Sequence, residues 1–86
     1  MDWQVYILEC SDGTFYTGIS NNLASRIDKH NSGRGAKYTK NRLPVALVYK
    51  ETLKNKSESL KREIEIKKLT RSQKLDLINS INFAPT

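Results

Sequence analysis

The sequence predicts an α+β domain, in which a small three-stranded, mainly antiparallel sheet is flanked by helices in the order β-β-α-β-α-α. Three observations carry this prediction. Two runs of β-forming residues flank a tight-turn signal near the N-terminus, an apolar run follows in the middle of the chain, and capping residues open three helical segments.

The first two strands form a hairpin. Residues 3–10 are rich in β-forming side chains, and Ser11-Asp12-Gly13 is a strong turn signal because Asp and Gly tolerate the dihedral angles of a tight turn. The segment from Phe15 to Ile19 then predicts the returning strand.

The middle of the chain predicts a helix, a loop and a strand. Asn21 or Asn22 can cap a helix, which residues 31–33 (Asn-Ser-Gly) would end. Residues 33–44 are expected to form a basic loop closed by a proline, and residues 45–49, apolar almost throughout, predict the third strand.

Two helices are expected to complete the domain. Asn55 and Glu58 suggest a capping box for a helix over residues 56–68. Thr70 and Gln73 suggest another, opening a helix with three apolar residues on one side: Leu75, Ile78 and Ile81. We therefore expect one domain over residues 1–82 and a tail over residues 83–86.

Composition favours a polyanionic partner. The 86 residues hold 15 Lys and Arg against 9 Asp and Glu, a formal charge of +6, and residues 1–20 contain no basic residue at all. The excess on the remaining chain suits nucleic acid, although many small proteins are basic without binding it. A single cysteine, Cys10, and the absence of a long apolar run predict a cytoplasmic protein without membrane association. We also expect the protein to be a monomer.

Two tyrosines and a glycine on the hairpin are the first candidates for a site. Tyr6 and Tyr16 lie on its two arms, where a tyrosine usually serves packing. Gly18 draws attention because glycine weakens a strand unless something must approach its backbone closely.

An arginine, a histidine and a carboxylate are the others. Arg26 and His30, four residues apart, share a helix face, where they could hold a phosphate and move a proton or could simply be solvated. Glu63 falls on a helical arc between Leu60 and Ile66, so it is partly shielded and either holds a cation or pairs with Lys67.

Together these residues resemble a known family. Val5-Tyr6-Ile7, then residues 16–20 (Tyr-Thr-Gly-Ile-Ser), and the later Arg26, His30 and Glu63 are similar to the motifs of GIY-YIG nucleases. Residues 32–39 and 60–63 resemble the small single-domain bacterial members. The chain departs from the pattern in having Gln4-Val5 before the first tyrosine and Thr17 inside the second tripeptide, and Asn79 is the nearest match to a late asparagine of the family.

The resemblance implies a phosphodiester hydrolase, an endonuclease that uses one Mg²⁺ or Mn²⁺ ion. Glu63 would ligate the metal, Tyr6 would activate the attacking water with a pKa lowered by nearby cations, and Arg26 would stabilise the phosphate. Tyr16 and His30 would position groups or relay protons, and Gly18 would keep the floor of the site open.

The expected partner is nucleic acid, and DNA is favoured over RNA. The side chains expected to bind it belong to the basic loop and its neighbourhood: Lys29, Arg34, Lys37, Tyr38, Lys40 and Arg42. Tyr38 could stack on an unpaired base. A binding module on the same fold without chemistry is the alternative, and a domain for protein interactions, which the lack of an evident apolar stripe disfavours, is the third.

Overall fold

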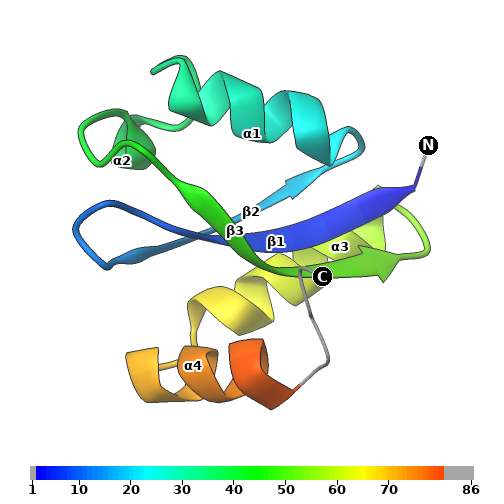
Figure 1. The fold of residues 1–86 in the computed structure, drawn as a ribbon. Helices are drawn as coiled ribbons and strands as arrows, with labels where there is room; N and C mark the ends of the chain where they lie inside the picture. The colour runs from blue at the N-terminus through cyan, green and yellow to red at the C-terminus, as the bar shows by residue number, and fades with distance from the viewer. Residues whose placement is uncertain (1, 81–86) are drawn as a thin grey trace.

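The hairpin and a third strand form the predicted antiparallel sheet. A computed structural model describes residues 2–80 of the chain. Strand β1 (Trp3–Glu9) pairs with β2 (Phe15–Ser20) on one side and with β3 (Ala46–Leu53) on the other, both antiparallel, so the strand order is β2-β1-β3 (Figure 1). The predicted α+β class is confirmed.

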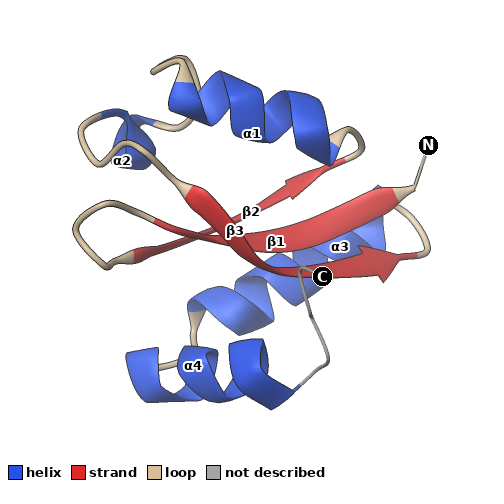
Figure 2. Cartoon of the chain, viewed as in Figure 1, coloured by secondary structure: helices blue, strands red, loops and turns tan. Residues whose placement is uncertain are grey.

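Helices cover both faces of this sheet. Helix α1 (Leu23–Asn31) and the one-turn α2 (Lys37–Lys40) lie on one face, while α3 (Lys56–Lys67) and α4 (Arg71–Ser80) lie on the other (Figures 1 and 2). The central strand β1 is therefore buried on both sides, which explains its continuous apolar run.

Alternation along β1 divides the core into two clusters. Tyr6 and Leu8 point to the α1 face, where Leu23 and Val45 pack against them. Val5 and Ile7 point to the α3 face, where Tyr49 and Ile66 complete the second cluster. Because successive strand residues point to opposite faces, the site residue Tyr6 lies on the α1 side of the sheet.

The helix boundaries follow the predicted capping residues. The side chain of Asn22 accepts a hydrogen bond from the backbone of Ser25, and that of Asn55 accepts one from Glu58. At α4 the box is reciprocal: the Thr70 amide donates to the Gln73 side chain at 2.9 Å, and the Gln73 amide donates to Thr70 Oγ1 at 3.2 Å. Each bond satisfies an amide that a helix start leaves unpaired.

Three local predictions were wrong or incomplete. The basic loop contains helix α2, and β3 continues four residues beyond Tyr49 because Lys50 to Leu53 keep pairing with β1. On α3, Leu60 is exposed instead of sharing the shielded arc with Glu63. For β3, pairing with β1 overrides the local polarity of residues 50–52.

Helix α4 packs through a different face from the one expected. Leu77 and Ile78 contact the second core cluster, whereas Leu75 is exposed. The predicted Ile81 contact and the tail over residues 83–86 lie outside the described residues.

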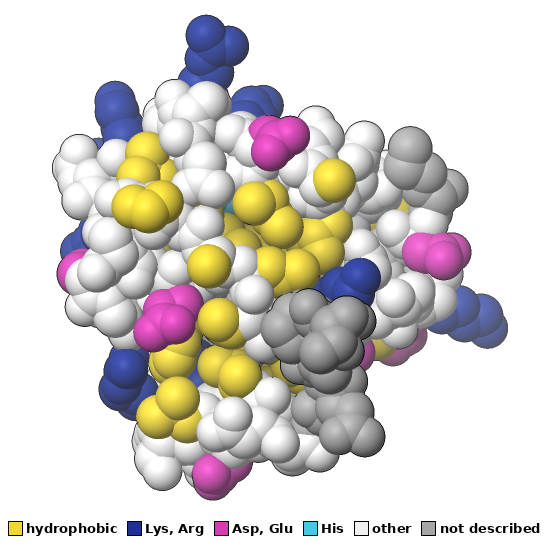
Figure 3. All heavy atoms as spheres, in the orientation of Figure 1, with side chains coloured by type: hydrophobic (Ala, Val, Ile, Leu, Met, Phe, Trp, Pro, Cys, Tyr) yellow, Lys and Arg dark blue, Asp and Glu magenta, His cyan; other side chains and the backbone are white. Residues whose placement is uncertain are grey.

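The surface combines apolar and basic regions. On the face in Figure 3, hydrophobic side chains gather in the centre and Lys and Arg side chains project from the margins. The apolar Leu60 and Ile64 are exposed one turn apart on α3, which the sequence did not reveal. Between residues 2 and 80, no helix has the length and apolar character needed to cross a membrane.

Candidate functional site

Tyr6 and Gly18 form the floor of the site. They are directly paired across β1 and β2, and Tyr6 is fully buried. A Cβ atom at position 18 would lie 2.6 Å from Tyr6 Oη and 2.8 Å from its Cζ. Tyr6 is thus the group that approaches the backbone at Gly18, and the missing side chain makes room for its phenol.

His30 forms a hydrogen bond with the Tyr6 hydroxyl. It lies in the last turn of α1, is fully buried, and places Nε2 3.0 Å from Tyr6 Oη and Nδ1 2.8 Å from Thr39 Oγ1. Burial first, and the charge of Arg26 second, lower the pKa of His30. The imidazole is therefore neutral at neutral pH, and it belongs to the interior, not to a solvated helix face.

Arg26 brings a fixed positive charge to the same place. It lies one turn before His30 on α1 and is half-buried. Its contact with the Tyr6 phenol is the main influence that raises the pKa of the guanidinium, with Tyr16 contributing further. Tyr16 lies beside this group, with its ring centroid 5.1 Å from that of His30.

The pKa of Tyr6 corrects one expectation. Burial raises the pKa of the phenol, Arg26 opposes this increase, and the charges of Tyr16 and Glu63 add to it. The predicted lowering by cations is wrong in sign because desolvation outweighs the guanidinium. Tyr6 is a neutral hydroxyl at neutral pH, which needs a base beside it to give up its proton.

Glu63 on α3 supplies the carboxylate. Its side chain is 17% exposed and forms an ion pair with Lys67 at 3.5 Å, so the alternative interpretation of this position also holds in part. The carboxylate is near enough to Tyr6 for its charge to influence the pKa of the phenol. The charge of Glu63 has a smaller influence on the phenol than burial or Arg26.

Glu63 is the carboxylate of this site that could hold a metal ion. Among residues 2–80 no three His, Cys, Asp or Glu side chains group together as ligands would. Glu63 would therefore be the single carboxylate of such a site, and waters and a phosphate would complete the coordination, as Mg²⁺ prefers.

A hollow of about 370 Å³ opens beside Tyr16. It is lined by aromatic rings from β2 and α2, a threonine and two lysines from the helices of the opposite face: Phe15, Tyr16, Thr17, Tyr38, Lys67 and Lys74. The hydroxyl of Thr17 is buried without a hydrogen-bond partner in the described structure. Sequence reasoning missed Thr17, Lys67 and Lys74 as binding candidates, because only the tertiary fold brings them together.

The predicted basic side chains divide into two groups. Four are exposed and project from α1, α2 and the loop between them: Lys29, Arg34, Lys37 and Lys40. Asn79 is also exposed, near the end of α4, with no hydrogen bond to the Tyr6 cluster among the described residues.

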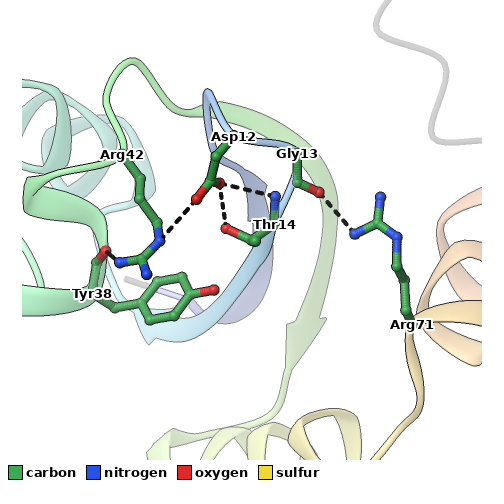
Figure 4. Close-up of polar contacts among 6 residues, drawn as sticks. All are labelled: Asp12, Gly13, Thr14, Tyr38, Arg42 and Arg71. Atoms are coloured by element: carbon green, nitrogen blue, oxygen red, sulfur yellow. Dashed lines mark hydrogen bonds and ion pairs between the residues drawn. The ribbon is translucent and has the colours of Figure 1, made fainter.

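Arg42 has a different environment (Figure 4). Its Nε lies 3.0 Å from Asp12 Oδ2, it donates to the Tyr38 carbonyl at 2.7 Å, and its guanidinium covers the Tyr38 ring at 4.2 Å. Beside it, Arg71 of α4 donates to the Gly13 carbonyl at 2.8 Å. Arg42 therefore joins the hairpin turn to α2. Its charge is paired with Asp12, and its guanidinium occupies one face of the Tyr38 ring.

Comparisons with known proteins show the family to which the chain is similar. A family model described as the GIY-YIG catalytic domain matches residues 2–76. A UPF0213 protein of Staphylococcus epidermidis is 60% identical over 74 residues, which cover 86% of this chain and 90% of that protein.

Two solved structures are also similar to the chain. The solution NMR structure of the UPF0213 protein BH0048 from Bacillus halodurans has a TM-score of 0.62 at 45% identity, covering 99% of this chain and 89% of that one. The solution NMR structure of the protein EF2693 from E. faecalis has a TM-score of 0.65 at 39% identity, and the match covers 93% of this chain and 85% of that one.

Proposed function

Because this chain belongs to the GIY-YIG family, a family of nuclease-type domains, we propose that it is a metal-dependent endonuclease that hydrolyses phosphodiester bonds in nucleic acid, DNA before RNA. The observation that carries the proposal is the contact of one buried phenol, Tyr6, with a neutral imidazole and its proximity to a guanidinium and a carboxylate. Each of these groups has a distinct task in phosphodiester hydrolysis.

Tyr6 and His30 form the proton-transfer pair of the proposal. A water molecule attacks phosphorus, and its proton passes to Tyr6 Oη while the Tyr6 proton passes to His30 Nε2 at 3.0 Å. The new P–O bond forms as the bond to the leaving oxygen breaks, and that oxygen takes a proton from solvent. The lowered pKa of His30 keeps the imidazole neutral before the reaction, so that one of its two ring nitrogens can accept a proton.

Arg26 and Glu63 would manage the negative charge. The Arg26 guanidinium faces the scissile phosphate and stabilises the charge that develops on it. When bound at Glu63, a Mg²⁺ or Mn²⁺ ion would polarise the phosphate and stabilise the leaving oxygen. The shielded position of the carboxylate supports this role, because a charge that is partly removed from water needs a positive partner.

The strand around the cut would lie on the basic surface. The four exposed basic side chains of α1, α2 and the loop between them would hold flanking phosphates: Lys29, Arg34, Lys37 and Lys40. Lys74 offers a further charge beside the hollow, where Lys67 is already paired with Glu63. Tyr38 would contribute through its exposed edge, since Arg42 already covers one face of its ring. Such contacts to the backbone favour binding that tolerates many sequences.

A non-catalytic binding module on the same fold is the second candidate, favoured by the Glu63–Lys67 ion pair. A pure binder needs the lysines and Arg26 but gains nothing from a carboxylate, which repels phosphate. Glu63 therefore separates the two candidates.

The test is a nicking assay with Glu63→Gln, which keeps the size of the side chain and removes its charge. We expect cleavage with Mg²⁺ or Mn²⁺ to fall on the order of 10³-fold or more, while binding persists or tightens. Arg26→Ala should weaken cleavage strongly and binding modestly, since the charge it stabilises builds up during the reaction.

Two controls make the result decisive. Glu58→Gln, on the same helix but exposed, should cleave like the wild type. Thermal melts of all variants exclude unfolding. Cleavage that survives Glu63→Gln in a folded protein would mean that Glu63 is not the metal ligand, and would favour the binding module.

A further inference from the structure

The segment that covers His30 contains a buried threonine. Thr39 lies in the one-turn helix α2, among exposed lysines, yet its side chain is fully buried. Its Oγ1 lies 2.8 Å from His30 Nδ1 and 3.0 Å from the Ala36 carbonyl oxygen. A threonine in so polar a segment would ordinarily face water, so its burial against an imidazole calls for a cause.

The Thr39 hydroxyl has one proton, so it can donate only one of its hydrogen bonds to His30 and Ala36 and must accept the other. A carbonyl oxygen can only accept, so the Thr39 proton points to Ala36. The Thr39 oxygen can then only accept from His30, which places a proton on Nδ1. The Ala36 amide lies 3.4 Å from the same nitrogen and would donate to it in the opposite tautomer. We assign the proton to Nδ1 because the two bonds that require it there, at 2.8 and 3.0 Å, are shorter.

The same reasoning orients the other side of the ring. With the proton on Nδ1, Nε2 carries the lone pair, and it can accept the Tyr6 proton across 3.0 Å. The hydrogen bonds then run in one direction, from Tyr6 through His30 and Thr39 to the Ala36 carbonyl. In the opposite tautomer, Nε2 would present an N–H to Tyr6 and could not take its proton.

The backbone of the same segment fixes the ring in place. A Cβ atom at position 35 would lie 2.7 Å from His30 Cα, so Gly35 lets the chain pass directly against the histidine. Gly35 and Thr39 therefore act together, one allowing the approach and the other making the hydrogen bond.

We propose that Thr39 is a positioning residue, whose hydroxyl holds His30 in the Nδ1–H tautomer so that Nε2 is the base for Tyr6. The assignment of a catalytic benefit rests on the proposed nuclease function, whereas the tautomer itself does not. The basic loop over residues 33–44, which is expected to bind phosphates, would thus also position His30.

The tautomer can be measured directly, because His30 is the only histidine of the chain. Long-range ¹H–¹⁵N correlation spectra of the full-length protein at neutral pH should show a protonated Nδ1 and an unprotonated Nε2. Thr39→Val keeps the shape of the side chain and removes the hydroxyl, so the proton should redistribute toward Nε2. Thr39→Ser keeps the hydroxyl and should retain the wild-type pattern.

Cleavage supplies the second measurement. Thr39→Val should lower kcat about tenfold or more with little change in KM, and Thr39→Ser should recover most of the loss, since the interaction concerns proton transfer and not binding. Lys61→Ala, at an exposed position of α3 to which no role in binding or catalysis is assigned, should leave kcat unchanged.

The outcomes separate the two proposals. A wild-type Nε2–H tautomer, or an Nδ1–H tautomer that survives in Thr39→Val, would overturn the role of Thr39 whatever the activity. A wild type with the expected tautomer but no cleavage of any substrate would overturn the nuclease proposal instead. If Thr39→Val does not fold, the wild-type spectrum and Thr39→Ala still decide the first question.

Discussion

At the scale of single residues, the site depends on two glycines, which have no side chain, as much as on the polar side chains around them. Gly18 leaves the space that the Tyr6 phenol fills, and Gly35 leaves the space through which the chain passes His30. Both glycines lie beside buried polar groups, so a methyl group at either position would displace a hydrogen-bonding partner, not water.

The first residue-scale prediction concerns Gly18→Ala. The added Cβ would overlap the Tyr6 hydroxyl, so we expect a loss of about 1–3 kcal/mol in the free energy of unfolding, as in other overpacked cores. Cleavage should fall with it, because Tyr6 can no longer reach His30. Urea denaturation measures the first effect and the nicking assay the second.

A double-mutant cycle with Tyr6→Phe checks the cause. Removal of the phenolic oxygen relieves the closest of the predicted overlaps, so the two substitutions should cost less together than the sum of their separate costs. Strict additivity would show that Gly18→Ala acts elsewhere than on Tyr6.

The second residue-scale prediction concerns pH. Burial lowers the pKa of His30, so the unfolded chain binds a proton more readily than the folded one between the lowered value and the ordinary value of about 6.5. The stability of the fold should therefore decline as the pH falls through that window. Asp12, whose pKa is lowered by hydrogen bonds from Thr14 and by Arg42, adds a loss only at more acidic pH.

Thermal melts from about pH 8 to pH 5 measure this dependence. In His30→Asn, which cannot titrate, the decline near pH 6 should disappear while the more acidic loss remains. An equal decline in both proteins would assign it to another group.

At the scale of elements, α3 must be fixed in rotation if Glu63 is to face the site. Arg62, the preceding residue, lies 2.9 Å from Glu51 of β3 and 3.0 Å from Glu65. Glu51 in turn accepts a hydrogen bond from the buried Tyr49, whose pKa is raised to about 12, chiefly by burial and then by Glu51. This network joins the helix to the edge strand of the sheet.

We therefore predict that Arg62→Met damages the site more than its distance from the chemistry suggests. Methionine keeps the apolar stem of the side chain but leaves Glu51 without its cation, at a cost of about 1–2 kcal/mol in unfolding free energy. Cleavage should fall even well below the melting temperature, because Glu63 loses its orientation.

Lys61→Met is the matched control for this variant. It removes an exposed ion pair to Glu58, 3.7 Å long, from the same helix, and should change stability by less than about 0.5 kcal/mol. If both variants cleave equally well, the network does not orient Glu63.

At the scale of the whole molecule, the basic side chains form two groups, one held in contacts within the protein and one exposed to solvent. Arg42 is held by Asp12 and Tyr38 and joins the hairpin turn to α2, whereas Lys37 and Lys40 project into solvent. Counting basic residues treats all three alike, but only a free charge releases counterions when it meets a phosphate.

Binding to a DNA duplex should therefore depend steeply on salt, with a log–log slope of about 3–5 for a protein of this size. Lys37→Gln with Lys40→Gln should reduce that slope by about 2, at roughly 0.9 for each lost phosphate contact. Arg42→Gln should lower the melting temperature and alter the slope less. Fluorescence anisotropy over a salt series gives the slopes.

The control is an equal change of net charge elsewhere, Lys61→Gln on α3 with Lys68→Gln at the C-cap of that helix. If this pair reduces the slope as much as the pair on α2, affinity follows total charge, and no particular surface binds the nucleic acid.

The sequence by itself determined the class of fold, the hairpin, the capped helix starts and the family, because turns, caps and alternating strands depend on neighbours within a few residues. Gly33 illustrates this: it follows α1 with a φ of 81°, as its position after the helix predicted. Tyr6, Arg26 and His30 could be singled out because they belong to a spaced motif.

The tertiary structure decided what surrounds those residues. Thr39 reaches His30 over nine positions, Lys74 joins Tyr16 at one hollow, and the sign of the pKa shift of Tyr6 follows from burial that no local pattern encodes. The free energy of a buried polar group depends on its neighbours in space, and the fold brings those neighbours from distant parts of the chain.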